Sequence, residues 1–125
     1  MLTLICGIPN AGKTTFSFSF VNVIHLDDHK GTTEVCELVG GMDGSVVVEG
    51  VFGSPEKRKR LLESYKGEGT RCYFLDIPLH ESKRRENRGR SRFILENAHK
   101  HFEPPTYDEG WDEIIRIENG KLHTV

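Results

Sequence analysis

The stretch GIPNAGKTT, residues 7–15, decides the fold of this protein. Within it, Gly7, Gly12, Lys13 and Thr14 fit the pattern GxxxxGK[ST] completely. The preceding residues, LTLIC, are short and uniformly apolar, and they predict a buried strand that stops at the first glycine. A strand, a glycine-flanked turn and a following helix are the context in which this pattern binds phosphate. We therefore expect a phosphate-binding loop, followed by a helix that begins at Gly12 or Lys13.

Each part of this loop has a chemical purpose. The glycines let successive main-chain N–H groups point inward at phosphate oxygens, and the positive end of the following helix faces the same anion. The Lys13 ammonium can reach the β- and γ-phosphates of a nucleoside triphosphate, and the Thr14 hydroxyl can ligate Mg²⁺. We therefore predict that ATP and Mg²⁺ are the cofactors. The residues that we expect to contact the nucleotide are Gly7, Pro9, Asn10, Ala11, Gly12, Lys13, Thr14 and Thr15.

Strands and helices alternate along the chain after this loop. Apolar runs predict buried strands, and end signals predict helices, as where Ser54 caps a helix that Gly67 closes. The Asn119-Gly120 pair between two alternating runs predicts an antiparallel hairpin at the end of the chain. The alternation favours an α/β fold with a mainly parallel sheet and helices on its faces. The predicted strands are 2–6, 22–26, 45–50 and 71–77, and the later predicted helices are 54–67, about 79–87 and about 92–101.

Polar groups lie at the ends of these strands. Gly7, Asp27, Glu49 and Asp76 each end or follow a different predicted strand. Ligands of open parallel sheets bind at the carboxyl ends of the strands, so we expect these four positions to meet at one edge. Residues 29–44, between two of the strands, show no clear pattern.

The acidic pair after the second strand predicts the acceptor side of the site. A carboxylate there could take the proton of an incoming hydroxyl group. Adjacent side chains of an extended segment point in opposite directions, so we favour Asp27 over Asp28. Lys30 is positioned to hold an anionic acceptor, and Glu49 suits an acid that holds a Mg²⁺-bound water beside Thr14. A solvated acidic pair and a structural strand-end acid are the alternatives.

A basic segment predicts a lid. Residues 82–92, SKRRENRGRSR, carry six basic side chains and one acidic side chain. A solvated helix face is the usual explanation for such a run, but Gly89 offers a hinge beside Arg88 and the arginines continue past the helix. Arginine binds phosphate oxygens bidentately, and a closing lid excludes water. We therefore predict a lid over about residues 82–95, with the arginines Arg84, Arg85, Arg88, Arg90 and Arg92.

Composition narrows the class of protein. The 125 residues are sufficient for one domain, which we place at 1–125. No run approaches the roughly 18 apolar residues of a membrane helix, and the first strand has no basic leader of a signal peptide. The three cysteines form no zinc or CxxC pattern, so we expect reduced thiols in a cytoplasmic protein. Residues 56–100 carry a net charge of +6 between segments of −4 each, which suggests that the basic middle handles an anion.

Together these segments resemble a known family. Five segments are similar to the kinase domain of polynucleotide 5′-hydroxyl kinases and related small P-loop kinases: GIPNAGKTT, HLDDHK, VVVEG, FLDIPLHESKRRENRGR and FEPPTYDEGWDEIIRIE. The resemblance implies a three-layer α/β/α P-loop kinase fold with a five-stranded, mainly parallel sheet. It also implies that Asp27 activates the acceptor hydroxyl, that Lys30 contacts an acceptor phosphate and that Arg88 contacts the transferring phosphate. The implied catalytic residues are thus Lys13, Asp27 and Arg88, and the implied acceptor is a 5′-hydroxyl of DNA or RNA.

Other functions remain open at this point. A switch GTPase would carry an NKxD base-specificity motif, which is absent, and motor ATPases are normally longer. Relatives of the resembled family have a longer stretch between the second and third strands and often read Asp-x-Thr-Asn where this chain has EGVFG. A small-molecule or nucleoside kinase and a non-catalytic ATP-binding regulatory module are therefore the alternatives. The basic residues Lys57, Arg58, Lys59 and Arg60 could offer a track for nucleic-acid phosphates.

Overall fold

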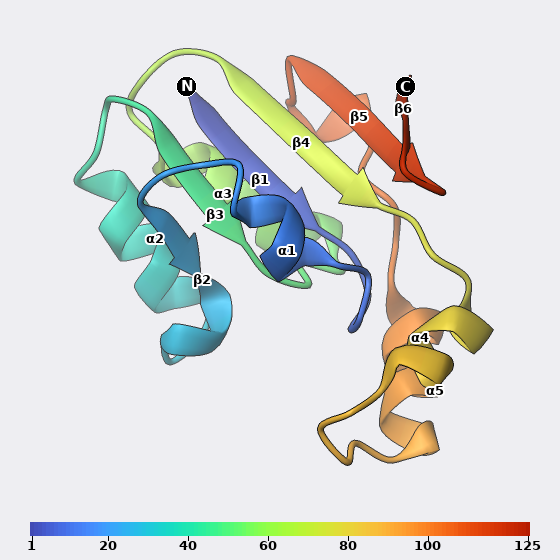
Figure 1. The fold of residues 1–125 in the computed structure, drawn as a ribbon. Coiled ribbons are helices and arrows are strands. Elements are labelled where there is room, and N and C mark those ends of the chain that lie inside the picture. The colour runs from blue at the N-terminus through green and yellow to red at the C-terminus, as the bar shows by residue number, and fades with distance from the viewer.

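A computed structural model describes all 125 residues. The chain forms one six-stranded sheet with helices on both faces and beyond one end (Figure 1). In chain order the elements are β1 (Leu2–Cys6), α1 (Lys13–Ser17), β2 (Val23–His25), η1 (Leu26–Asp28), α2 (Thr32–Gly40), β3 (Val46–Glu49), α3 (Pro55–Ser64), β4 (Thr70–Leu75), α4 (Leu79–Arg85), α5 (Arg92–His101), η2 (Tyr107–Glu109), β5 (Glu113–Glu118) and β6 (Lys121–Thr124).

The sheet has the order β2-β3-β1-β4-β5-β6. The first five strands of that order are parallel, and β6 pairs antiparallel with β5. All five residues of β1 are buried at the centre, where Leu4 lies opposite Val48 and Cys72. The predicted α/β fold and the predicted C-terminal hairpin are confirmed, with six strands where five were expected. The sixth strand is β6, which follows the two-residue turn at Asn119 and Gly120.

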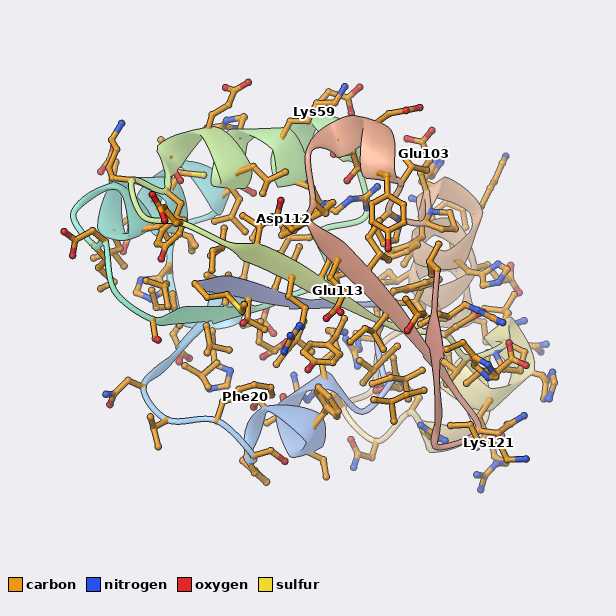
Figure 2. The ribbon with its side chains drawn as sticks, turned by 90° about the horizontal axis from the view of Figure 1, so that it is seen from above. Phe20, Lys59, Glu103, Asp112, Glu113 and Lys121 are labelled. Atoms are coloured by element: carbon orange, nitrogen blue, oxygen red, sulfur yellow. The ribbon has the colours of Figure 1, made fainter.

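Two apolar clusters divide the molecule into layers. On one face, Val35 and Val39 of α2 and Leu61 of α3 pack on the strands in a cluster of 14 buried residues. On the other face, Phe16 and Phe20 pack against Tyr73 of β4, with ring centroids 5.0 and 6.0 Å from it. Figure 2 shows α3 on one side of the sheet and α1 on the other, with Phe20 labelled beneath the strands. The helices α2 and α3, the sheet, and α1 are therefore the three expected layers.

Two local predictions need correction. The segment 29–44, which the sequence leaves without a pattern, contains the nine-residue helix α2. Its apolar residues Val35 and Val39 are one helical turn apart and fully buried, so a single short stripe holds it on the sheet. The helix after the phosphate loop is shorter than its apolar spacing suggests. It ends at Ser17, and hydrogen-bonded turns carry the chain to Phe20.

The ends of the strands position the site. The helices α4 and α5 lie beyond the arrowhead of β4, at the carboxyl ends of the parallel strands (Figure 1). The phosphate loop leaves β1 at the same end, because β1 and β4 run parallel. Separately, no helix in this fold is both long and apolar enough to cross a lipid bilayer.

Candidate active site

The phosphate loop curls tightly after β1. Gly7 has no room for a side chain, because a Cβ atom there would lie 2.7 Å from the carbonyl oxygen of Leu75. Gly12 forms the N-cap of α1 and has a φ of 93°. Residues other than glycine rarely adopt this left-handed backbone conformation. Glycine is therefore needed at both ends of the loop, as the pattern predicts. The helix that follows, α1, is a single short turn, and the loop residues Asn10, Gly12 and Lys13 line the cavity at its start.

Lys13 is held under the loop. Its ammonium donates a hydrogen bond to the carbonyl oxygen of Ile8 at 2.9 Å, and the residue is 9% exposed. Burial lowers the pKa of Lys13, and the negative charges of Glu49 and Asp27 partly offset that effect. A bound anion would add a compensating negative charge beside this buried ammonium.

A polar cavity of about 380 Å³ opens over the loop. Only one of its 14 lining residues, Val51, is hydrophobic. It brings together loop residues, the acids after β2 and β3, and three lid arginines. The predicted site residues that line it are Pro9, Asn10, Gly12, Lys13, Thr14, Thr15, Asp27, Glu49, Arg85, Arg88 and Arg90.

The two acids reach the cavity from neighbouring strands. Glu49 ends β3 and is 7% exposed, and Asp27 lies in the single turn η1 after β2. Asp27 and Asp28 lie in a 3₁₀ turn, whereas our preference for Asp27 assumed an extended segment. The preferred residue is nevertheless the one that lines the cavity, since Asp27 does so and Asp28 does not. His25 contributes a contact that the sequence analysis missed: its Nδ1 lies 2.7 Å from Oε1 of Glu49. A signal existed, because His25 ends a strand two residues before Asp27.

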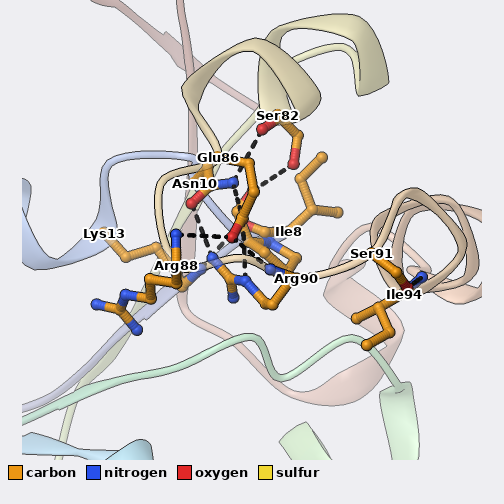
Figure 3. A network of polar contacts seen from close by, with 10 residues as sticks. Ile8, Asn10, Lys13, Ser82, Glu86, Arg88, Arg90, Ser91 and Ile94 are labelled. Carbon is orange, nitrogen blue, oxygen red and sulfur yellow. Dashed lines mark hydrogen bonds and ion pairs between the residues drawn. The ribbon is translucent and has the colours of Figure 1, made fainter.

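The arginines of the predicted lid differ in what they contact. Arg85 donates to the carbonyl oxygen of Asn10 at 3.1 Å and pairs with Glu81, and Arg90 pairs with Glu86 at 3.0 Å. Arg88 lines the cavity, and its guanidinium has no partner within the protein. In Figure 3 the Arg88 side chain points away from the surrounding hydrogen bonds. Of the three arginines that line the cavity, Arg88 is therefore the one whose charge is free for a ligand.

The remaining predicted residues lie outside this cavity. Gly7, the first residue of the loop, is buried, and Ala11 lines a second cavity. Lys30 is exposed, and its main-chain N–H donates to Glu34 at 3.2 Å. Arg84 and Arg92 are exposed and line neither cavity.

The second cavity, of about 680 Å³, adjoins the first. The two share Gly12, Thr15 and Arg85, and the turn between β5 and β6 closes its far side. Asp76 lies here, where Arg116 pairs with it at 3.3 Å, so it does not join Asp27 and Glu49. Of the four strand-end positions, Asp27 and Glu49 line the first cavity and Asp76 lines the neighbouring one, whereas Gly7 is buried and lines neither.

The predicted basic track on α3 lacks one of its four members, because Lys57, Lys59 and Arg60 are exposed but Arg58 is not. Arg58, which we placed in a basic track, is fully buried and pairs with Glu109 at 2.7 Å. Trp111 also donates to that carboxylate, at 3.1 Å. Residues 102–110 line neither cavity and instead pack beside α3. Within their motif, FEPPTYDEG, only Pro105 and Glu109 are buried, and Glu109 supports the core through its pair with Arg58.

This combination of loop, sheet order and lid can be compared with known proteins. No protein-family model matches the chain, and no curated protein is similar to it in sequence. Among solved structures, the chain is similar to a gluconokinase from Sinorhizobium meliloti 1021, with a TM-score of 0.76. The match covers 95% of this chain and 82% of that one, at 14% sequence identity. The fold is that of a P-loop kinase. A P-loop kinase fold does not by itself distinguish the polynucleotide kinases from other kinases that share it.

Proposed function

We propose that the protein is an ATP-dependent kinase that transfers the γ-phosphoryl group to a hydroxyl group. One observation carries this proposal: Lys13, Asp27 and Arg88, from three distant parts of the chain, line the same polar cavity over the phosphate loop. A buried cation, an acid and a free guanidinium are the groups that phosphoryl transfer to an alcohol requires.

The two cavities divide the nucleotide between them. The loop N–H groups and Lys13 would hold the β- and γ-phosphates in the first cavity. The second cavity shares Gly12 and Thr15 with the first and would take the base and ribose. Five of its 14 lining residues are hydrophobic, which suits a base better than the first cavity does.

The site fits Mg²⁺ as well. No group of three or more His, Cys, Asp or Glu side chains could hold a metal ion unaided. Mg²⁺, however, is commonly bound through one or two protein oxygens, with phosphates and waters completing its shell. The Thr14 hydroxyl and the Glu49 carboxylate offer such oxygens in the cavity, and His25 orients the carboxylate. When bound, the ion would neutralise charge on the phosphates.

The transfer itself uses three side chains. Asp27 accepts the proton of the acceptor hydroxyl as the acceptor oxygen bonds to the γ-phosphorus and the bond to the ADP oxygen breaks. Lys13 and Arg88 stabilise the negative charge on the transferring group and on the leaving oxygen. Arg88 is suited to this role because no protein carboxylate occupies its guanidinium.

A small polar alcohol fits the acceptor side best. The first cavity has one hydrophobic lining residue and no aromatic side chain on which a nucleobase could stack. Arg58, one of the four basic residues of the track that would guide a nucleic acid, is buried and cannot contact it. The similar solved structure is a gluconokinase, which supports a polyhydroxylated small molecule, such as a sugar or sugar acid, as the class to test first. A 5′-hydroxyl end of DNA or RNA is the competing acceptor.

The test is phosphate transfer from γ-labelled ATP to a panel of acceptors: sugars, sugar acids, nucleosides and a 5′-hydroxyl oligonucleotide. We expect transfer to a sugar-like alcohol, abolished in Asp27→Asn and retained in the matched control Asp28→Asn. Transfer to the oligonucleotide and to no other acceptor would show that the acceptor is a polynucleotide and not a small alcohol. Tight ATP binding without transfer to any acceptor would instead identify a regulatory nucleotide-binding module.

A further inference from the structure

One carboxylate organises the lid. Glu86 follows α4, and its Oε2 accepts the main-chain N–H groups of Arg88 and Arg90 at 2.9 and 3.0 Å (Figure 3). Its Oε1 accepts the Nε–H of Arg90 at 3.0 Å and the side-chain amide of Asn10 at 2.9 Å. The carboxylate thus closes residues 86–90 into a small loop and ties that loop to the phosphate loop.

Asn10 completes the link from the other side. Its amide nitrogen donates to Glu86 and to the carbonyl oxygen of Ser82, both at 2.9 Å, and its amide oxygen accepts from Arg90 at 2.9 Å. The orientation of the amide is fixed by chemistry, because the first two partners only accept and the guanidinium only donates. Ser82 adds a second link, since its hydroxyl donates to the carbonyl oxygen of Pro9 at 2.7 Å.

These contacts determine where Arg88 points. Its main-chain N–H is held by Glu86, and the adjacent Gly89 has a φ of 77°, so the chain turns sharply at this position. The side chain of Arg88 then leaves the network and lines the cavity without a protein partner. The guanidinium of Arg90, in contrast, donates hydrogen bonds to Asn10 and Glu86 and is not free for a ligand.

We propose that Asn10 and Glu86 are positioning residues, an inference that rests on the proposed kinase function. Together they hold the lid on the phosphate loop and aim Arg88 at the transferring phosphate. The Glu86 side chain is only 10% exposed, unlike that of Glu96, which is 48% exposed in a simple pair with Lys83. Charge-assisted hydrogen bonds gain strength when several of them converge away from solvent.

The arrangement prepares the site before substrate arrives. Ordering a lid during the reaction would consume part of the binding free energy, whereas a lid already held in place avoids that loss. Asn10 lies in the phosphate loop, so its contact with Glu86 fixes the position of the lid relative to that loop. The two segments are 76 residues apart in sequence and depend on this contact to act together.

The test compares Asn10→Gly, Glu86→Gln and the double variant with the control Glu96→Gln. Glycine adopts the left-handed conformation of Asn10, whose φ is 69°, without strain, and it adds no charge near the phosphates. We expect each single variant to lower kcat about 10-fold with little change in the KM for ATP, because the Arg88 interaction is strongest in the transition state. Because the two residues act as one unit, the double variant should also lose about 10-fold rather than about 100-fold.

A second measurement does not depend on activity. In the absence of ligands, trypsin should cut after Arg88 and Arg90 faster in both single variants than in the wild type or Glu96→Gln, because the lid opens. Unchanged cleavage would overturn the proposed link, and faster cleavage with unchanged kcat would overturn its role in aiming Arg88. A 100-fold loss in the double variant would also contradict it. If the wild type transfers phosphate to no acceptor, the proposed function and the aiming role fall together, while the cleavage rates still decide whether the lid is held.

Discussion

Arg58 and Glu109 form a fully buried ion pair in which two guanidinium nitrogens donate to the two carboxylate oxygens, at 2.7 and 2.8 Å. Arg58 also donates to the carbonyl oxygen of Phe52 at 2.7 Å. Burial raises the pKa of Glu109, but the hydrogen bonds from Arg58 and Trp111 more than offset it and hold the pKa below its usual value. Arg58 lies in α3 and Glu109 lies in η2, just before β5, so the pair holds these two segments together.

Removing Arg58 should therefore destabilise the protein. Arg58→Met leaves Glu109 buried without its partner, and we expect the free energy of unfolding to fall by about 3–5 kcal/mol. Urea denaturation followed by circular dichroism measures this change. The control Lys59→Met, at an exposed position of the same helix, should change it by less than about 0.5 kcal/mol. Similar losses in the two variants would contradict the structural role of the pair.

His25 should influence the magnesium requirement. Its ring orients the Glu49 carboxylate, and removal of such an outer partner commonly weakens metal binding by about 10-fold or more. We expect His25→Ala to raise the Mg²⁺ concentration that gives half-maximal transfer, at saturating ATP. His29→Ala is the matched control, because His29 pairs with Glu34 outside the cavity at 3.0 Å. Equal Mg²⁺ dependence in His25→Ala and the wild type would argue against Glu49 as a ligand to the ion.

Arg88 should matter more for turnover than for binding. Arg88→Ala removes the free guanidinium of the cavity, and we expect kcat to fall by about 100-fold or more, with a smaller change in ATP affinity. Steady-state kinetics and equilibrium titration with ATP separate the two effects. Arg92→Ala, at an exposed residue outside both cavities, should be close to the wild type. A larger loss in Arg92→Ala would move the catalytic role along the lid.

The lid network should lose its contribution to stability in acid. Hydrogen bonds from Asn10 and from the main chain at Arg90 lower the pKa of Glu86 from 4.5 to about 2. A carboxyl group with a lowered pKa in the folded state stabilises the fold above its unfolded pKa and loses that effect as the pH falls through the folded value. The difference in unfolding free energy between the wild type and Glu86→Gln should thus be full above about pH 5 and shrink toward pH 2. A difference that does not vary across this range would contradict the ionised state of Glu86.

Much of the site could be predicted because the signals are local. The pattern from Gly7 to Thr14 contains its own geometric requirements, and buried strands are recognisable from short apolar runs. Parallel pairing then brings the strand ends together, which is why Asp27 and Glu49 were found at the cavity. The helix α2 escaped prediction because its apolar stripe is short, and tertiary packing of Val35 and Val39 stabilises it.

The sequence by itself determined the phosphate loop, the α/β alternation and the hairpin, since each follows from neighbouring residues. Only the tertiary structure decided which charges are free. Arg58 and Arg88 are both arginines in basic runs, yet one is buried against Glu109 and the other faces the cavity. Pairing between residues such as Asn10 and Glu86, 76 positions apart, depends on how the lid packs on the loop, and no local pattern encodes that distance.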